Sequence, residues 1–262
     1  MCDDDKRLFG KKVFISGAGS GIGKAIALRC AREGADIAIN DLNATAAEET
    51  ASEVRKLGQQ AIVLVADVSE SAPVEQMVKD YYAQWKELDI LVNNAGIGGS
   101  MSRLISMDEA KFDRNWKINT KSVFLMSKYF AAKMKKRDSL ENQLRGKIIN
   151  IASMRGLKGR ALFGEYSAAK AAVVSLTETL ALELGKFRIT ANAVCPGLIY
   201  TPIYGNTTYD NLSAIGEPIC LEYKKVGLPE DVAGAVFFLA SSDSDWITGH
   251  AIPVSGGQFG LL

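Results

Sequence analysis

Short apolar runs alternate with longer helix-length stretches along almost the whole chain, and this alternation is the strongest constraint on the fold. The runs are rich in Val, Ile and Ala and show little polar alternation, which is typical of strands buried on both faces of a parallel sheet. They cover residues 12–16, 35–40, 61–66, 89–94, 147–152, 189–194 and 251–255, and helical stretches such as 23–33, 44–57 and 75–85 lie between them. We therefore predict an α/β fold with right-handed crossovers and a doubly wound, seven-stranded parallel sheet flanked by helices.

No low-complexity linker divides the chain, so residues 1–262 are expected to form one domain. The N-terminus, about residues 1–8, is expected to be flexible. Residues 200–226 form a long stretch without a clear period, and long loops in compact domains often cover binding sites. We expect this stretch to be the substrate loop. The charge-dense residues 133–145 are expected to be a solvated helix end and loop.

Net charge, apolar runs and the number of cysteines and histidines disfavour several classes of function. The formal net charge is only +1, so no global field favours binding to nucleic acid or to an anionic membrane. The acidic N-terminus lacks the apolar segment of a signal peptide, and no apolar run is long enough to span a bilayer. The four cysteines show no CxxC spacing, which favours reduced thiols in a cytoplasmic protein. A single histidine, His250, cannot build a His-rich metal site, so we expect no metal.

A glycine-rich loop, SGAGSGIG, occupies residues 16–23 between the first predicted strand and the first predicted helix. Glycines at Gly17, Gly21 and Gly23, with Gly19 overlapping, allow a tight turn and a close approach of the backbone to a pyrophosphate. The helix start then offers free N–H groups and the positive end of its dipole to the phosphates. The loop lacks GK[ST], which disfavours a nucleoside triphosphate site.

Asp41 follows the second predicted strand. A carboxylate at this position can accept hydrogen bonds from the adenosine ribose of NAD and repels the 2′-phosphate of NADP. Aspartate is equally suited to cap the helix that follows. Because Ser20 is not basic and no arginine or lysine lies beside Asp41, we predict NAD as the cofactor.

Tyr166 and Lys170 form the motif YSAAK, and residues at positions i and i+4 of a helix share one face. A nearby ammonium favours the phenolate, so we expect Lys170 to lower the pKa of Tyr166 toward a working range for acid/base chemistry. Ser153 follows the fifth predicted strand, at the edge of the sheet where ligand-facing residues collect. A surface helix pair and a turn cap are the alternative interpretations of these residues.

The order and spacing of these motifs resemble the short-chain dehydrogenase/reductase (SDR) family from about residue 9 to residue 258. The resemblance implies a Rossmann fold. Two mild departures are Ser16, where threonine is usual, and Ser122, where glycine is frequent. The matching segments are SGAGSGIG, Asp67 in ADV, residues 93–96 (NNAG), Asn119 in KINTKS, Ser153 in NIAS, YSAAK, Pro196-Gly197 followed by Thr201, and SGGQ at residues 255–258.

The resemblance also implies a role for each residue of the site. Tyr166 is the expected general acid/base, and Lys170 lowers its pKa and holds the nicotinamide ribose. Ser153 hydrogen-bonds the substrate oxygen, and Asn119 anchors a water that relays protons to Lys170. The expected cofactor contacts are Gly17, Gly19, Ser20, Gly21, Ile22, Gly23, Asp41, Leu42, Asp67, Val68, Asn94, Ala95, Gly96, Tyr166, Lys170, Pro196, Gly197, Ile199 and Thr201.

The substrate is less constrained than the reaction. The segment after the sixth strand resembles that of polyol and secondary-alcohol dehydrogenases, so we predict a small secondary alcohol and its ketone as substrate and product. The alternatives are a 3-oxoacyl-thioester or hydroxysteroid dehydrogenase/reductase and, outside enzymes, a nucleotide-binding regulator. Arg155 is a candidate for an anionic group of the substrate or, alternatively, part of a solvated loop. The expected substrate contacts are Ser153, Arg155, Tyr166, Tyr200 and Tyr204, with Met154 and Tyr223 as further candidates.

The resemblance also implies assembly into a homotetramer or homodimer, and the apolar tail FGLL at residues 259–262 is compatible with a buried interface.

Overall fold

A computed structural model describes residues 6–138, 143–215, 220–221 and 226–258. Its centre is a seven-stranded sheet with the order β3-β2-β1-β4-β5-β6-β7, and every pairing is parallel. The predicted fold is confirmed. The strands are β1 Lys12–Ser16, β2 Asp36–Asp41, β3 Ala61–Val65, β4 Ile90–Asn93, β5 Gly146–Ile151, β6 Ile189–Pro196 and β7 Ala251–Val254.

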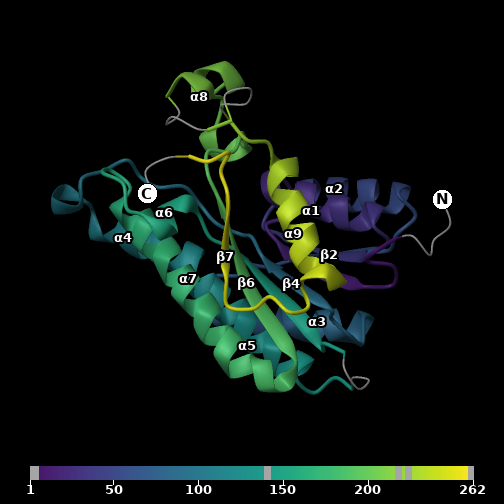
Figure 1. Cartoon of the computed structure of the whole chain (residues 1–262). Helices are drawn as coiled ribbons and strands as arrows, with labels where there is room; N and C mark the ends of the chain where they lie inside the picture. The colour runs from purple at the N-terminus through teal and green to yellow at the C-terminus, as the bar shows by residue number, and fades with distance from the viewer. Residues whose placement is uncertain (1–5, 139–142, 216–219, 222–225, 259–262) are drawn as a thin grey trace.

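Helices cover both faces of the sheet (Figure 1). The first face carries α1, α2 and α9, and the second carries α3, α5 and α7. Shorter helices and turns lie near the edge of the sheet where the strands end (Figure 1). The helices are α1 Gly21–Arg32, α2 Ala44–Lys56, α3 Ser71–Gln84, α4 Glu109–Trp116, α5 Ser122–Met134, α6 Met154–Leu157, α7 Gly164–Leu184, α8 Tyr209–Ile215 and α9 Pro229–Ala240.

The side chains of β1 divide the core into two clusters. Val13 and Ile15 pack beneath α1, α2 and α9, whereas Phe14 points to the other face. The Phe14 ring lies 4.7 Å from that of Phe130 and 5.8 Å from that of Tyr81, measured between centroids. Because both faces are covered, strand residues are apolar without alternation, which is the pattern the sequence shows.

The order of the strands reverses between β1 and β4, because β2 and β3 follow on one side of β1 and β4 to β7 on the other. The crossovers from β1 and from β4 leave this point on opposite sides, so a crevice opens at the carboxyl ends of the strands.

Several predicted boundaries differ from the structure. Asp41 closes β2 rather than following it, and β6 continues to Pro196 because its last residues pair with β7. The N-terminal stretch that we expected to be flexible includes Leu8, which is buried and donates its N–H to the Glu33 carbonyl. The stretch 200–226 contains α8, so it is partly helical. Tyr223 and the FGLL tail lie outside the described residues.

Within the described ranges, no helix combines the length and the apolar character needed to cross a membrane. The same part of the chain holds no cluster of three or more His, Cys, Asp or Glu side chains arranged to bind a metal ion. Cys30, Cys195 and Cys220 are free thiols.

Candidate dinucleotide and active site

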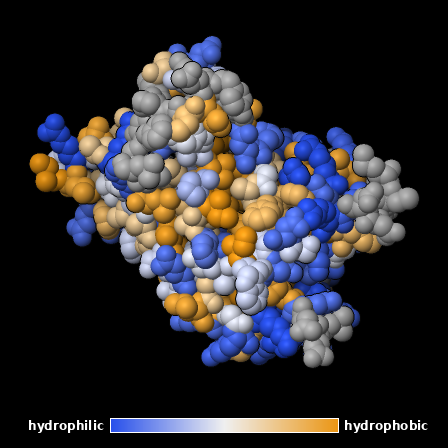
Figure 2. All heavy atoms as spheres, viewed as in Figure 1, coloured by the Kyte–Doolittle hydropathy of each residue, from blue (hydrophilic) through white to orange (hydrophobic). Residues whose placement is uncertain are grey.

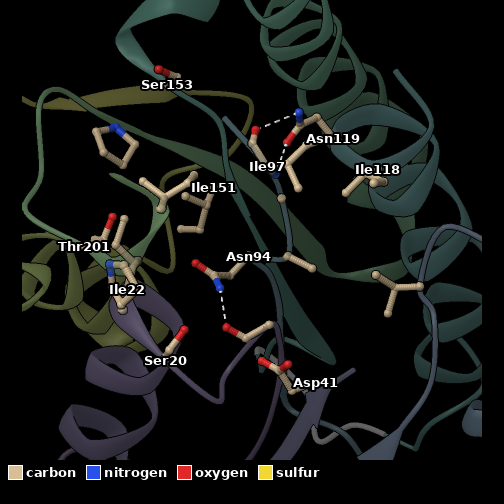
Figure 3. A pocket seen from close by; sticks show the side chains of 18 of the residues that line it. Ser20, Ile22, Asp41, Asn94, Ile97, Ile118, Asn119, Ile151, Ser153 and Thr201 are labelled. Carbon is tan, nitrogen blue, oxygen red and sulfur yellow. Dashed lines mark hydrogen bonds between the residues drawn. The ribbon is translucent and has the colours of Figure 1, made fainter. Parts of the chain in front are cut away.

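A cavity of about 510 Å³ opens at the carboxyl ends of the strands, at the point where the strand order reverses (Figure 3). Its walls come from the loops after β1, β2, β3, β4, β5 and β6 and from the α4–α5 and α7 regions. The lining residues are Gly17, Ser20–Ile22, Asn40–Leu42, Ala66–Val68, Asn94–Ile97, Arg114, Ile118, Asn119, Ile151–Ser153, Tyr166, Lys170, Pro196, Gly197, Ile199 and Thr201–Tyr204.

Hydrogen bonds join the glycine loop to the end of β4. The Ser16 hydroxyl accepts from the N–H groups of Asn94, at 3.0 Å, and Ala95, at 3.1 Å. The Asn94 side chain donates to the carbonyls of Ser16, at 3.0 Å, and Gly17, at 2.9 Å. The serine at position 16 therefore supplies the hydroxyl that aligns the two loops at the point where the strand order reverses.

Glycine is required at two positions of the loop. Gly17 has a φ of +64°, in the left-handed region that side chains disfavour. A Cβ on Gly23 would lie 2.2 Å from the Gly17 carbonyl oxygen, so only glycine lets α1 start this close to β1. Ser20 is the N-cap of α1, yet its hydroxyl makes no capping hydrogen bond, and it lines the cavity. The positive end of α1 thus lies at the cavity wall, as phosphate binding requires.

The Asp41 carboxylate lies beside this loop. One of its oxygens accepts from the Gly19 N–H at 2.9 Å, and the other accepts from the Asn43 N–H at 3.0 Å. Asn43, and not Asp41, caps α2, since its side chain accepts from the Ala46 N–H. Asp41 is half-buried and lines the cavity, so the geometry fits a carboxylate that holds the adenosine ribose.

Ser153, Tyr166 and Lys170 line the same cavity. Ser153 is the N-cap of α6, where its Oγ accepts from the Arg155 N–H at 3.1 Å. Tyr166 and Lys170 lie one turn apart on α7, and the Lys170 ammonium is 5.8 Å from the centroid of the Tyr166 ring. The ammonium also donates to the Ile151 carbonyl at 2.9 Å.

Burial determines the titration of these groups. It raises the pKa of Tyr166 to about 12, although a hydrogen bond from the Ser153 side chain opposes the rise. Burial also lowers the pKa of Lys170 to about 8. We expected Lys170 to lower the pKa of Tyr166, but in this structure desolvation of the phenolate outweighs every favourable interaction.

Asn119 is fully buried within a π-helical turn, Lys117–Lys121, between α4 and α5. Its side chain donates to the Ile97 carbonyl at 3.0 Å and accepts from the Ile97 N–H at 3.1 Å (Figure 3). Asn115 accepts a further hydrogen bond from Asn119 at 2.8 Å. Turns of this kind are frequent at functional sites, where the inserted residue redirects a side chain.

Most predicted site residues line the cavity, but among the described residues five do not: Gly19, Gly23, Met154, Arg155 and Tyr200. Gly19 and Gly23 do not line the cavity, but they let the loop pack closely. A Cβ on Gly19 would lie against the Asp41 carboxylate, and a Cβ on Gly23 against the Gly17 carbonyl oxygen. Sequence reasoning missed Arg114 and Ile118, which precede Asn119 by five residues and by one. Their spacing to Asn119 offered no signal, because positions one and five residues apart do not share a helix face. It also missed Asn40, Ala66, Ile97, Ile151, Ala152, Pro202 and Ile203.

A parallel sheet with a glycine loop at its switch point and an acidic residue closing the second strand defines the class of dinucleotide-binding α/β proteins. A family model described as enoyl-(acyl carrier protein) reductase matches residues 17–258. The chain belongs to the short-chain dehydrogenase/reductase family of oxidoreductases.

Individual relatives match nearly the whole chain. A hydroxy(phenyl)methylsuccinyl-CoA dehydrogenase subunit from Thauera aromatica is 39% identical over 249 residues, which are 93% of this chain and 94% of that protein. A sorbitol dehydrogenase from Cereibacter sphaeroides is 34% identical over 263 residues, 97% of this chain and 99% of that protein. The crystal structure of a short-chain type dehydrogenase/reductase from Mycobacterium marinum superposes with a TM-score of 0.88 at 33% identity and covers 98% of each chain.

Proposed function

We propose that the protein is an NAD(H)-dependent oxidoreductase that interconverts a secondary alcohol and its ketone, with Tyr166 as general acid/base. The proposal rests on the observation that a single cavity is lined both by the expected dinucleotide-binding residues and by the expected catalytic residues. The glycine loop and Asp41 line one end, and Ser153, Tyr166 and Lys170 line the other. A nicotinamide dinucleotide laid along this cavity, with its adenosine at Asp41, would bring its reactive ring to Tyr166.

Asp41 supports NAD over NADP. Its carboxylate is already fixed by the Gly19 and Asn43 N–H groups, so it cannot turn away to admit a 2′-phosphate without losing both hydrogen bonds. Arg114 also lines the cavity. A phosphate-binding role for Arg114 is the competing possibility, and the cofactor preference of an Asp41 variant tests it.

The bound dinucleotide would supply the hydride acceptor or donor. In alcohol oxidation, Tyr166 as phenolate takes the hydroxyl proton while Ser153 donates a hydrogen bond to the same oxygen and stabilises its developing charge. Lys170 lies against the Tyr166 ring and carries a positive charge at neutral pH. That charge and a cationic nicotinamide both favour the phenolate over the phenol.

A polyol, diol or similar small hydroxy compound is the proposed substrate. Tyr204 lines the cavity beside Ser153 and Tyr166, and its hydroxyl can hold a second hydroxyl of the substrate. The sorbitol dehydrogenase relative supports this class. The Thauera aromatica relative favours a second candidate, a hydroxyacyl thioester. Arg155, next to the active site, would then hold an anionic group of the substrate, and Tyr200 would border the same entrance.

The test is NADH formation over a panel of polyols, diols, hydroxyacyl thioesters and hydroxysteroids. Tyr166→Phe should abolish turnover and leave NAD binding within about twofold, because the phenyl ring keeps the shape of the site and loses only the oxygen that accepts the substrate's proton. A Tyr166→Phe variant with full activity would refute the acid/base assignment. NAD binding without turnover of any panel member by the natural protein would favour a nucleotide-binding regulator.

We further propose a homotetramer or homodimer in the cytoplasm. Phe112 and Trp116 stack on the surface of α4 with ring centroids 6.4 Å apart, and Phe124 is exposed on α5. Apolar side chains also gather in the middle of the face that carries β7 and α9 (Figure 2). Faces of this kind favour burial between subunits. Light scattering after size exclusion measures the assembly directly.

A further inference from the structure

The segment that follows β4 is held by side chains from three separate helical regions. Asn119 binds both backbone groups of Ile97, and the Asn115 side chain donates to the Gly98 carbonyl at 3.1 Å. Glu165 holds the next position. Its Oε1 accepts from the Ser100 N–H at 2.6 Å and from the Ser100 hydroxyl at 2.7 Å. The segment that continues from the cavity wall at Ile97 is therefore held by side-chain hydrogen bonds at Ile97, Gly98 and Ser100.

On both sides of Ser100 the same segment lies directly against the start of α7. A Cβ on Gly99 would lie 2.6 Å from a ring carbon of Phe163 and 3.2 Å from the Cβ of Tyr166. Ser102 and Phe163 form a parallel bridge. A Cβ on Gly164 would lie 2.5 Å from the Leu104 side chain. We call this contact, residues 98–104 against residues 163–166, the seam.

Glu165 lies at the middle of the seam. Its side chain is only 1% exposed, although it occupies the first turn of α7, where glutamate is ordinarily solvated. Burial opposes its ionisation, but the two hydrogen bonds from Ser100 to Oε1 favour the carboxylate, and the pKa of the carboxyl is held below the ordinary value. The other oxygen, Oε2, is buried and makes no hydrogen bond with the described residues. A carboxylate is costly to bury, so one that is buried and hydrogen-bonded stabilises one arrangement of the chain.

We propose that Glu165 is a positioning residue that fixes Tyr166 relative to the cavity wall by fastening Ser100 to the start of α7. Tyr166 is the next residue along the chain, and its own Cβ packs against Gly99. Any movement of residues 98–100 is therefore transmitted to the phenol that handles the proton. This inference rests on the proposed function, because it concerns the placement of its acid/base.

Two substitutions distinguish this positioning role from a favourable interaction of the Glu165 charge with the helix dipole. Glutamine keeps the Oε1 acceptor for Ser100 and removes the charge, whereas alanine removes both. The exposed Glu178, on the same helix, is the matched control for loss of a glutamate elsewhere on α7.

The experiment compares Glu165→Ala, Glu165→Gln, Ser100→Ala and Glu178→Ala in the full chain. Glu165→Ala should lower kcat about tenfold or more and leave the Kd for NAD within about twofold, since a displacement of about 1 Å can cost up to 100-fold in rate. Glu165→Gln should recover most of kcat. Ser100→Ala keeps the N–H donor and removes only the hydroxyl donor, so it should lower kcat less than Glu165→Ala does and have no further effect in the Glu165→Ala background. Glu178→Ala should match the natural protein.

Hydrogen exchange supplies a readout independent of turnover. The Ser100 amide and its neighbours in the seam should lose protection in Glu165→Ala and keep it in Glu165→Gln. Unchanged protection, or an unchanged kcat in an active Glu165→Ala protein, would overturn the proposal. If Glu165→Ala does not fold, Glu165→Asp takes its place, because the shorter side chain withdraws the carboxylate from both Ser100 donors, and an unchanged kcat in Glu165→Asp overturns the proposal. If the natural protein oxidises no alcohol, the proposed function fails, and the exchange data alone then decide whether Glu165 fastens the seam.

Discussion

Replacing Lys170 with methionine should stabilise the folded protein while abolishing its activity. The Lys170 side chain is 5% exposed, and burial lowers the pKa of its ammonium from 10.5 to about 8. Each pKa unit corresponds to about 1.4 kcal/mol, so keeping this buried ammonium charged at pH 7 lowers the free energy of unfolding by about 3 kcal/mol. Methionine has a similar length and no charge, so Lys170→Met removes that cost.

Part of the gain is lost again. The Lys170 ammonium donates to the Ile151 carbonyl at 2.9 Å, and methionine leaves that carbonyl without this donor, at a cost of about 1 kcal/mol. The expected net effect is an increase of about 2 kcal/mol in the free energy of unfolding at pH 7. For a chain of this size that corresponds to a rise of about 5 °C in Tm.

The sign of the pH dependence follows from proton binding. Between pH 8 and 10.5 the folded protein has released the Lys170 proton while the unfolded chain still holds it. The unfolded state then binds more protons, so the stability of the natural protein rises with pH across this window. The advantage of Lys170→Met should therefore be largest below pH 8 and shrink toward pH 10.5.

Urea denaturation of the protein without cofactor at pH 7, 9 and 10 measures the effect, with the m-value as a check that the transition is unchanged. The exposed Lys158 is the matched control, since Lys158→Met should change stability little at any of these pH values. A Lys170→Met protein that is no more stable than the natural one at pH 7 would refute the reasoning. So would a gain that stays constant up to pH 10.

Three further predictions concern the cofactor and the substrate oxygen. Asp41→Ala should lower the ratio of kcat/KM for NAD over NADP by about tenfold or more, because it removes the repulsion of a 2′-phosphate, and an unchanged ratio would exclude this role. Gly23→Ala should abolish NAD binding in calorimetry or fail to fold, because its Cβ would meet the Gly17 carbonyl oxygen at 2.2 Å; binding of normal affinity would contradict the loop geometry. Ser153→Ala should lower kcat about 100-fold and leave the Kd for NAD unchanged, through loss of a donor to the reacting oxygen.

The fold was predictable because its signals are local and repeated. Apolar runs without alternation predicted a sheet buried on both faces, and all seven strands lie within two residues of their expected bounds. The glycine loop was predictable for the same reason, since a strand, a glycine turn and a helix start are adjacent in sequence. The helix inside residues 200–226 was missed because its seven residues are too few to show a clear period.

The site was predictable only in part. Tyr166, Lys170, Ser153 and Asn119 were identified by the resemblance to a family, but their partners were not. Glu165 was missed because a glutamate in the first turn of a helix has the same sequence signature whether it is solvated or buried. Arg114 and Ile118 were missed because only the crossover from β4 to α5 brings their helix to the cavity.

The sequence by itself determined the sheet, the glycine loop and the identity of the residues that could do the chemistry, since these follow from residue type and spacing along the chain. The tertiary structure decided the electrostatics of those residues. Spacing suggested that Lys170 would lower the pKa of Tyr166, yet both groups are buried, and desolvation raises one pKa and lowers the other. It also decided that Glu165 binds Ser100, 65 residues away. Desolvation and contacts between distant segments depend on what packs around a group, and sequence spacing does not contain that information.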